Sequence, residues 1–548
     1  MPHYSLSGSL LLLALQATAQ NHQRPNILYI MSDDHAYQCI SAYGSKVFRQ
    51  TPTPNIDRIA REGMRFDRAF VENSISTPSR ACLITGLYSH QNGQRQLAEG
   101  IDTTKTFFSE LLQQVGYQTA VVGKWHMICN PKGFDYYQIL DDQGPYFNPD
   151  FRSNRTHNKY VREQGYTTEL ITKHAIEWLD SRDKQKPFCL MVHHKAPHRN
   201  WMPAIQNMGM YDNVTFPLPH SWNDDFSTRG SATRTQRMDI GRDMTLQSDL
   251  KVDTKHLDNP DGSRVFGEWY RLNEEQKPAI QQYYTQRSRD FAAANLQGEA
   301  LRQWKYQTYL RDYMAVIHSV DESVGELLNY LDRNGLLDNT IVVYTSDQGF
   351  YMGEHGWFDK RFMYEESFRT PLVVRYPKEI KPGSVSHQLV QNIDYAPTFL
   401  EYAGVKKPKE MPGRSLKPLF RADSTRWRHD LYYHYYDYPA WHMVRKHDGV
   451  RTERYKLVHF YGKGSERAVA ENKYQRIPGT REYNGYMGML HSGYIGNDPD
   501  INYDELYDLQ TDPLEHHNLI DDPRYAKVKK QLQRKLDNYR KKLKIDEY

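Results

Sequence analysis

Four short apolar runs, each followed at once by polar or charged residues, constrain the fold of this chain more than any other feature. The runs span 26–31, 119–122, 188–192 and 340–345. Runs of this length and character predict strands that are buried on both faces, as in a parallel sheet covered by helices. Ligands of open α/β sheets bind at the carboxyl ends of the strands, so we expect the four polar clusters to converge on one site.

Helical periodicity between these runs predicts the helices that connect and cover the strands. Apolar residues recur at helical spacing over 106–115, 168–179 and 303–331. The segment 200–290 is polar, rich in aromatic residues and weakly periodic, which predicts an insertion over the sheet that is not part of the core. We expect the large domain to span 22–426.

A change of pattern near Trp427 predicts a second, smaller unit. Short alternating runs such as 450–460 indicate antiparallel strands, and 527–544 has the pattern of a charged helix. A chain of 548 residues is also longer than one ordinary core requires. We therefore predict a C-terminal α+β subdomain over 427–548, with a small antiparallel sheet and one helix.

The first 19 residues have the pattern of an export signal, although they carry no Lys or Arg. An apolar run over 10–15 precedes Ala17-Thr18-Ala19, a small-x-small motif that predicts cleavage after Ala19. We expect an exported protein of the periplasm, the cell surface or the medium. No later run approaches the roughly 18 apolar residues of a membrane span, so none is predicted.

Charge and cysteine usage exclude several other classes of protein. The 71 Lys and Arg residues nearly balance the 67 Asp and Glu residues, whereas nucleic-acid-binding proteins concentrate positive charge. No nucleic-acid partner is therefore expected. The four cysteines lack the spacing of a zinc site or a disulfide framework, which predicts buried thiols.

The strongest functional signal lies in residues 76–86, which read STPSRACLITG. Pro78 suits the first turn of a helix, which would place Ser76 just before a positive helix end and Arg80 one turn along. Such an arrangement concentrates positive potential on an anion. On these residues alone, an N-capping serine and a solvated arginine explain the segment equally well.

This segment resembles the signature of the type I sulfatases, in which Ser-x-Pro-Ser-Arg is followed by Ala-x-Leu-Ile-Thr-Gly. Further ordered matches lie at 33–34, 123–126, 196–198, 346–349, 353–356, 506–509 and 512–513. The resemblance implies an alkaline-phosphatase-like fold, a mixed sheet sandwiched by helices, and the hydrolysis of sulfate esters. It also implies a maturation enzyme that converts Ser76 to formylglycine, whose hydrated aldehyde is the nucleophile.

Two of the polar clusters predict a metal site. Asp33 and Asp34 follow one predicted strand, and Asp347 and Gln348 follow another. Their hard oxygen atoms suit calcium or magnesium rather than zinc. We expect them to hold one divalent ion together with residue 76, with calcium as the first choice and magnesium as the alternative.

The cleavage of a sulfate ester needs positive charge for the transferring group and a proton or other stabilisation for the leaving alkoxide. Arg80, Lys124 and Lys360 offer the positive charge. The resemblance implies that His198 and Lys360 protonate the leaving group. It further implies that His126 takes a proton from the remaining hydroxyl of the nucleophile as the sulfated intermediate collapses.

Segments 195–203 and 435–439 resemble those of bacterial sulfatases that remove 6-O-sulfate from N-acetylglucosamine in mucin or in heparan-type glycosaminoglycans. Asp359 and Arg361 flank one of the sulfate-binding lysines, and His447 lies in a segment of the smaller unit that can reach over the site. We expect these three side chains to contact the hydroxyl groups of a terminal sugar in an exo-acting enzyme.

Three alternatives stay open at this stage. The first is a sulfatase for another position or another sugar, such as galactose or uronate. The second is a two-metal phosphatase or phosphodiesterase with an unmodified Ser76 and further ligands such as His35 and His355, which the expected lysines disfavour. The third is a non-catalytic protein that binds sulfated glycans, which the competent residue at every reacting position disfavours.

Overall fold

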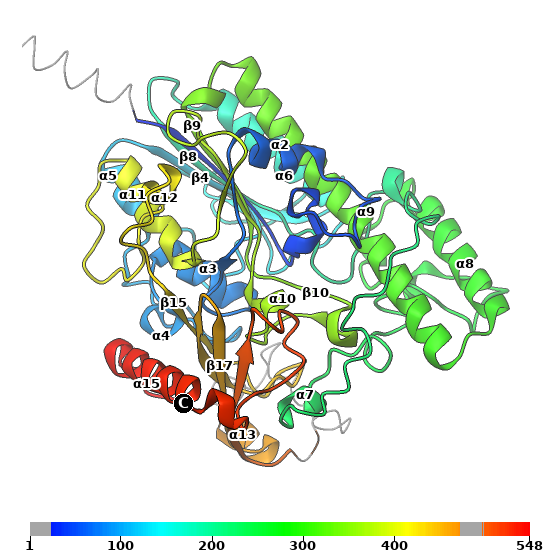
Figure 1. Ribbon diagram of the computed structural model, residues 1–548. Coiled ribbons are helices and arrows are strands. Elements are labelled where there is room, and N and C mark those ends of the chain that lie inside the picture. The colour runs from blue at the N-terminus through cyan, green and yellow to red at the C-terminus, as the bar shows by residue number, and fades with distance from the viewer. Residues whose placement is uncertain (1–23, 472–495, 497) are drawn as a thin grey trace, which may run out of the picture.

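The computed structural model describes residues 24–471, 496 and 498–548 (Figure 1). The expected export signal over 1–19 and its cleavage point lie outside these residues. The four apolar runs form strands whose residues are buried throughout, except for Gln118 at the start of β4. They are β1 (Asn26–Ser32), β4 (Gln118–Gly123), β8 (Phe188–His193) and β9 (Thr340–Ser346).

These strands are neighbours in one sheet. β1 pairs in parallel with both β8 and β9, and β4 pairs in parallel with β8, which gives the order β9-β1-β8-β4. Their carboxyl ends are in register, since Ser32 faces Ser346, Met31 faces His193 and Gly123 faces His193. The predicted parallel core is confirmed, and its register brings the four polar clusters to one edge.

Six further strands extend the sheet to ten and make it mixed. β5 (Tyr136–Leu140) continues it in parallel, followed by antiparallel β6 (Asp150–Ser153) and β7 (Val161–Arg162). On the other side of β9 lie β12 (Leu372–Arg375), β2 (Met64–Phe66) and β13 (Ser384–Ser386), of which β12 runs antiparallel to both β9 and β2.

Helices cover both faces of the sheet (Figure 1). Leu28 and Ile30 of β1 face one core, and Ile27, Tyr29 and Met31 face the other, as the alternation of a strand requires. The first core is covered by α2 (Pro54–Glu62), α6 (Thr167–Ser181) and α9 (Gly298–Arg333). The second is covered by α3 (Ser76–Thr85), α5 (Phe108–Gln114), α11 (Tyr395–Tyr402) and α12 (Lys417–Phe420).

The segment 200–290 differs from its prediction in two ways. Its apolar side chains, such as Trp201 and Phe216, belong to the same buried cluster as the sheet, so the segment forms part of the core. It also contains α7 (Ala232–Thr235) and most of α8 (Gln276–Ala294), which packs against α9. α8 buries only three of its side chains, too few to leave a helical period in the sequence.

The C-terminal unit contains the predicted antiparallel sheet. β15 (Asp430–Tyr435), β16 (His447–Thr452), β17 (Tyr455–Gly462) and β18 (Ile501–Asp508) pair in this order. The run 450–460 is therefore parts of two strands around a tight turn. The predicted charged helix is α15 (Ala526–Leu543), and a short α13 (Ser465–Glu471) was not predicted.

In the described part of the chain, no helix combines the length and the apolar character needed to cross a bilayer. All four cysteines lie within this part and are free thiols, three of them buried and Cys129 partly exposed.

Candidate active site

The acidic centre lies where β1 and β9 end side by side. Asp34 donates its backbone N–H to Asp347 Oδ1 at 3.1 Å, and the Gln348 amide group donates to the same oxygen at 2.7 Å and also to Asp34. Asp34 has a φ of 67°, a left-handed conformation that is uncommon for a non-glycine residue and concentrates at functional sites. Asp34, Asp347 and Gln348 therefore lie together, next to Asp33 in the chain, and their role as ligands of one ion stays a prediction.

Helix α3 adds Ser76 and Arg80 to this centre. The helix begins at Ser76, and Ile75 is its N-cap. The sequence analysis had placed Ser76 just before the helix, one residue too far out. Ser76 Oγ donates to Asp33 Oδ1 at 3.1 Å. One turn along, the Arg80 guanidinium donates to Asp347 Oδ2 at 3.1 and 2.9 Å.

The end of β4 supplies Lys124 and His126. Lys124 Nζ is paired with Asp33, and its carbonyl accepts a hydrogen bond of 2.8 Å from Arg80. His126 also has a left-handed backbone, with a φ of 55°. Its Nδ1 lies 3.3 Å from the hydroxyl of Thr77, which places the imidazole beside residue 76.

Two further basic side chains approach Asp34. Lys360 Nζ lies 2.5 and 2.6 Å from the two Asp34 carboxylate oxygens. His198 Nε2 is 3.9 Å from Asp34 Oδ2, while its Nδ1 lies 2.7 Å from the carbonyl of Arg199. Five of the six predicted catalytic side chains therefore contact the acidic centre, and His126 contacts Thr77, next to Ser76 in the chain.

Burial makes the negative charge of this centre costly. Burial raises the pKa of Asp34 to about 7 against the opposing effect of Lys360, and it also raises the pKa of Asp347. For Asp33 the neighbouring cations outweigh burial, since Lys124, with a smaller effect of Arg80, holds its pKa well below the usual range. A bound cation would stabilise the ionised form of all three carboxylates.

The basic groups of the centre differ in protonation. Burial lowers the pKa of Lys124 to about 8, whereas Asp34 raises that of Lys360 against the effect of burial. Burial, reinforced by Lys124, lowers the pKa of His126 to about 4, and burial takes that of His198 well below its ordinary value. Near neutral pH both imidazoles are therefore neutral while Lys360 carries its proton.

The donor atoms fit a divalent metal ion with a preference for oxygen ligands. Gln348 Oε1 is buried and has no hydrogen-bond partner in the structure, although it lies beside two carboxylates. An unpaired buried carbonyl oxygen of this kind is costly unless a ligand satisfies it. Asp33, Asp34 and His198 also each offer one ligand atom within 4.8 Å of the others.

The three predicted sugar-binding residues divide into two groups. Asp359 and Arg361 lie on either side of Lys360, both with a positive φ, and Arg361 Nη1 lies 3.7 Å from Asp437 of the smaller unit. His447 is buried, its Nδ1 is 2.8 Å from the Arg445 carbonyl, and its Nε2 accepts a 3.0 Å hydrogen bond from the backbone of Met363. Both its ring nitrogens are thus engaged by the main chain.

His442, rather than His447, contacts the loop of Asp359 and Arg361. Its Nε2 lies 3.0 Å from Asp359 Oδ2, and Nδ1 lies 3.1 Å from the carbonyl of Arg237. The sequence analysis missed this residue, because His442 follows Tyr438-Pro439 in a loop without periodic pattern. Only its ion pair with Asp359 reveals it.

The two histidines that a two-metal enzyme could use as further ligands have other partners. His35 Nδ1 lies 2.5 Å from the hydroxyl of Tyr344, and His355 Nδ1 is 2.7 Å from Asp224. Neither contacts the acidic centre, where a two-metal enzyme would need them.

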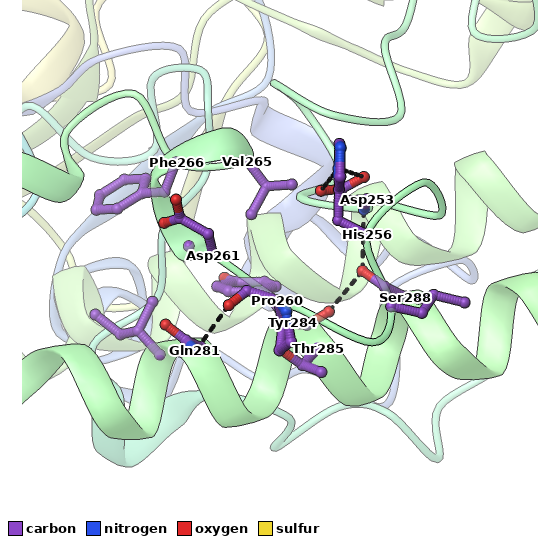
Figure 2. Close-up of a pocket in the computed structure, with 13 residues that line it drawn as sticks. Asp253, His256, Pro260, Asp261, Val265, Phe266, Gln281, Tyr284, Thr285 and Ser288 are labelled. Carbon is purple, nitrogen blue, oxygen red and sulfur yellow. Dashed lines mark hydrogen bonds and ion pairs between the residues drawn. The ribbon is translucent and has the colours of Figure 1, made fainter.

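One cavity lies in the insertion, apart from the acidic centre (Figure 2). Its volume is about 20 Å³, and its wall comes from the loops at 253–266 and from α8. That volume holds about one water molecule, so the cavity cannot admit a sugar.

Comparison with protein families decides the assignment. A family model described as sulfatase matches residues 25–405, and one described as N-sulphoglucosamine sulphohydrolase, C-terminal, matches 353–479 and 493–542. The chain belongs to the sulfatase family. The resemblance seen in the signature is confirmed, and this sulfatase is a sulfuric ester hydrolase with an alkaline-phosphatase-like fold.

Several known sulfatases are similar to this one. An N-acetylglucosamine-6-O-sulfatase of Bacteroides thetaiotaomicron is 45% identical over 95% of this chain and 87% of its own length. The human N-acetylglucosamine-6-sulfatase is 28% identical over 79% and 72%. A solved structure, described as a complex with its substrate D-glucosamine-2-N,6-O-disulfate, is 44% identical, with a TM-score of 0.85 and coverage of 96% of this chain and 99% of that one.

Proposed function

We propose that this sulfatase removes 6-O-sulfate from terminal N-acetylglucosamine residues of host glycans, either mucin or heparan-type glycosaminoglycans. The observation that carries the proposal is the 45% identity, over 95% of the chain, to an N-acetylglucosamine-6-O-sulfatase. The 44% identical structure with a bound 6-O-sulfated glucosamine supports the same sugar and position.

We further propose that Ser76 is converted to formylglycine by a maturation enzyme and that Asp33, Asp34, Asp347, Gln348 and residue 76 hold one calcium ion. Calcium suits the carboxylate and amide oxygens, with magnesium as the alternative. Formylglycine would supply a nucleophilic hydroxyl when hydrated, and the ion would supply positive charge to the oxygens around residue 76. The unpaired Gln348 Oε1 supports this assignment of the ligands.

Arg80, Lys124 and Lys360 are assigned to binding the sulfate group. Their side chains approach the acidic centre from α3, from β4 and from the loop after β11 (Phe358–Asp359). Because the three come from separate elements of the fold, they can contact different oxygens of one anion. The charge-assisted hydrogen bonds of such groups are about twice as strong as neutral ones.

The two histidines are assigned to proton transfer. A low pKa leaves His126 neutral and able to accept a proton from the hydroxyl of residue 76, beside which Thr77 holds it. His198 and Lys360 approach Asp34 together and are assigned to the leaving group. Of these two, Lys360 is the one that carries a proton near neutral pH, and the sulfate anion of a bound substrate would raise the pKa of His198.

Asp359 and Arg361 are assigned to the sugar hydroxyls, and His442 joins them through its 3.0 Å contact with Asp359. The original assignment of His447 has less support, since its ring nitrogens are both engaged. The contact between Arg361 and Asp437 supports a pocket that the smaller unit helps to close. A pocket closed on one side admits chain ends, which supports exo action.

The division at residues 426 and 427 and the export of the protein also remain proposals. The change from the mixed sheet to the antiparallel sheet between α12 and β15 supports the division. Export rests on the small-x-small motif at 17–19.

A panel of positional isomers tests the proposed function. Protein whose peptide mass spectrum shows formylglycine at residue 76 is incubated with N-acetylglucosamine 6-sulfate, its 3-sulfate isomer, N-sulfated glucosamine and galactose 6-sulfate. We expect release of sulfate from the first compound and from the ends of glycan chains. Release from the 3-position or from galactose alone would contradict the substrate, and full activity with unmodified Ser76 would contradict the nucleophile.

A further inference from the structure

We propose that His355, His516 and Glu366, oriented by Asp224, form a second metal site for zinc or a similar borderline divalent ion. The bound ion would link the C-terminal unit, through His516, to the catalytic domain, through His355 and Glu366. Its donor atoms differ in kind from the hard oxygens of the acidic centre. It stands independently of the sugar and position proposed above.

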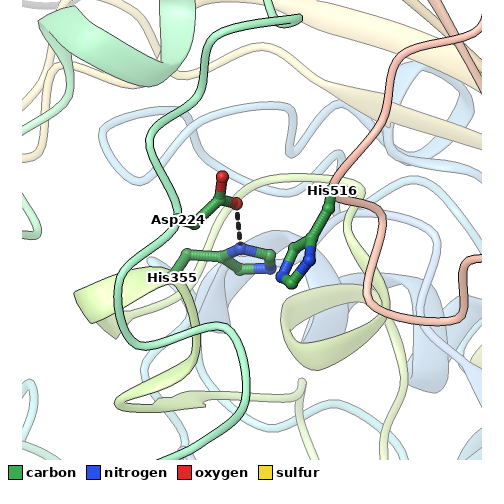
Figure 3. A group of neighbouring side chains, drawn as sticks. All are labelled: Asp224, His355 and His516. Atoms are coloured by element: carbon green, nitrogen blue, oxygen red, sulfur yellow. Dashed lines mark hydrogen bonds and ion pairs between the residues drawn. The ribbon is translucent and has the colours of Figure 1, made fainter.

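The residues come from segments far apart in the sequence (Figure 3). Asp224 belongs to the insertion, His355 to the 3-10 helix η7 (Glu354–Gly356), and His516 to the loop after β18. One ligand-capable atom from each of these three lies within 4.8 Å of the others. Glu366 lies in α10 (Glu365–Phe368), with its Oε2 3.7 Å from His355 Nε2.

Asp224 fixes the orientation of the central imidazole. Its Oδ2 lies 2.7 Å from His355 Nδ1 and forms an ion pair with Arg229 at 2.9 Å. With its charge already balanced, Asp224 serves as the outer carboxylate that metal-binding histidines commonly contact through their second nitrogen. The other nitrogen of His355 faces a ring nitrogen of His516, as Figure 3 shows.

Three polar atoms around this point are buried without a hydrogen-bond partner. They are His355 Nε2, His516 Nε2 and Glu366 Oε2. Unpaired buried groups of this kind are rare in native proteins, because each has lost its hydrogen bonds to water without gaining another partner. The 3.7 Å between His355 and Glu366 is too long for a hydrogen bond.

That distance suits two ligands of one metal ion. With metal–ligand bonds of about 2.0–2.1 Å, tetrahedral geometry separates the ligand atoms by about 3.3 Å. Closing around an ion would satisfy His355 Nε2 and Glu366 Oε2, and His516, whose ligand atom lies within 4.8 Å of that of His355, would supply the third bond. His355 is held in position by a left-handed backbone with a φ of 59°, a conformation typical of constrained functional residues.

A proton could replace the metal only in part. A protonated His355 between Asp224 and Glu366 would give His355 Nε2 and Glu366 Oε2 each other as partners. It would still leave His516 Nε2 without a partner. Two imidazoles with one carboxylate are the donor set of zinc and its transition-metal neighbours, and calcium prefers oxygen ligands. The two sites should therefore select different ions.

Metal titration of the full chain tests the proposal. The protein is stripped of metal, returned to excess calcium and titrated with Zn²⁺ by calorimetry, and Co²⁺ is added separately to record visible absorption. We expect one zinc ion per chain in the presence of calcium and the intense visible bands of tetrahedral cobalt. No zinc binding under these conditions would overturn the proposal.

Two variants locate the ion. His516→Ala should weaken zinc binding at least about tenfold and abolish the cobalt bands. His517→Ala, at the neighbouring and exposed histidine, should leave both unchanged. Glu366→Gln, which keeps the size of the side chain, should weaken binding as His516→Ala does.

Thermal unfolding provides a second readout. Zinc should raise the Tm of the unchanged protein and of His517→Ala, but not that of His516→Ala. Equal zinc affinity in all variants, or an equal rise in Tm, would place the ion elsewhere and overturn the proposal.

Discussion

Arg361 links the active-site loop to the C-terminal unit with one guanidinium. It lies 3.4 Å from Asp359 on its own loop and 3.7 Å from Asp437 across the boundary. Arg361→Ala should lower kcat/KM on N-acetylglucosamine 6-sulfate about 10- to 100-fold, the range expected for lost hydrogen bonds to a charged group. On a small aryl sulfate, which makes no sugar contacts, kcat/KM should change little.

The measurement compares kcat/KM on the two substrates, and His447→Ala serves as the control for a purely structural effect. Because the ring nitrogens of His447 are engaged by the main chain, its loss should reduce stability and affect both substrates alike. Equal losses on both substrates for Arg361→Ala would assign Arg361 to the sulfate group instead.

The sequence predicted those site residues that directly follow strands. Asp33, Lys124 and Asp347 follow strands whose register fixes where their side chains meet, so pattern alone placed them together. His442 and His447 lie five residues apart in the smaller unit, and nothing local distinguishes the one that pairs with Asp359. Which loop residue reaches the site depends on how two units pack, and that is a tertiary property.

At the scale of elements, Gly123 governs how closely β4 approaches β8. It has a φ of 103°, and a Cβ there would clash with the backbone carbonyl of His193. Gly123→Ala should lower the free energy of unfolding by about 1–2 kcal/mol for the left-handed conformation plus about 1–3 kcal/mol for the displaced strand. Because Lys124 follows directly, kcat should fall as well.

Gly116 is a matched control for this substitution. Its φ is 89°, but a Cβ there would meet nothing within 4 Å. Gly116→Ala should therefore show the conformational cost of about 1–2 kcal/mol alone, with kcat unchanged. Chemical denaturation of both variants gives the comparison, and equal losses of stability would contradict the role assigned to Gly123.

Elements with a strong apolar period were predicted well. β1, β9, α6 and α9 lie close to their predicted positions. The two strands are buried on both faces, and the two helices each bury one regular face against the sheet. α8 was missed because it buries few side chains and depends on contact with α9, such as that of Phe291 with Trp304. The insertion was misplaced outside the core because its buried aromatic residues follow no period.

For the whole molecule, removal of the proposed calcium ion should lower stability. Asp33, Asp34 and Asp347 are buried together, and without the ion their charge is opposed only by the neighbouring cations of the protein. At a calcium concentration of 100 Kd the ion contributes about 2.7 kcal/mol, so a calcium-selective chelator should lower Tm and excess calcium should restore it.

This measurement uses the His516→Ala variant, in which the proposed second metal site is disabled, so that the Tm reports on the acidic centre. Magnesium at the same concentration should restore less of the Tm if calcium is the natural ion. A Tm that does not respond to chelation or to either ion would contradict the metal assignment of the acidic centre.

Ser76 is only 2% exposed, and every other side chain of α3 is buried with it. A modifying enzyme must bring its own active site into contact with the serine side chain, which the folded protein does not permit. The proposed conversion therefore has to occur on the unfolded or nascent chain, before the sheet closes over α3. Maturation and folding thus compete in time, and a molecule that folds first stays permanently inactive, however much maturation enzyme it meets afterwards.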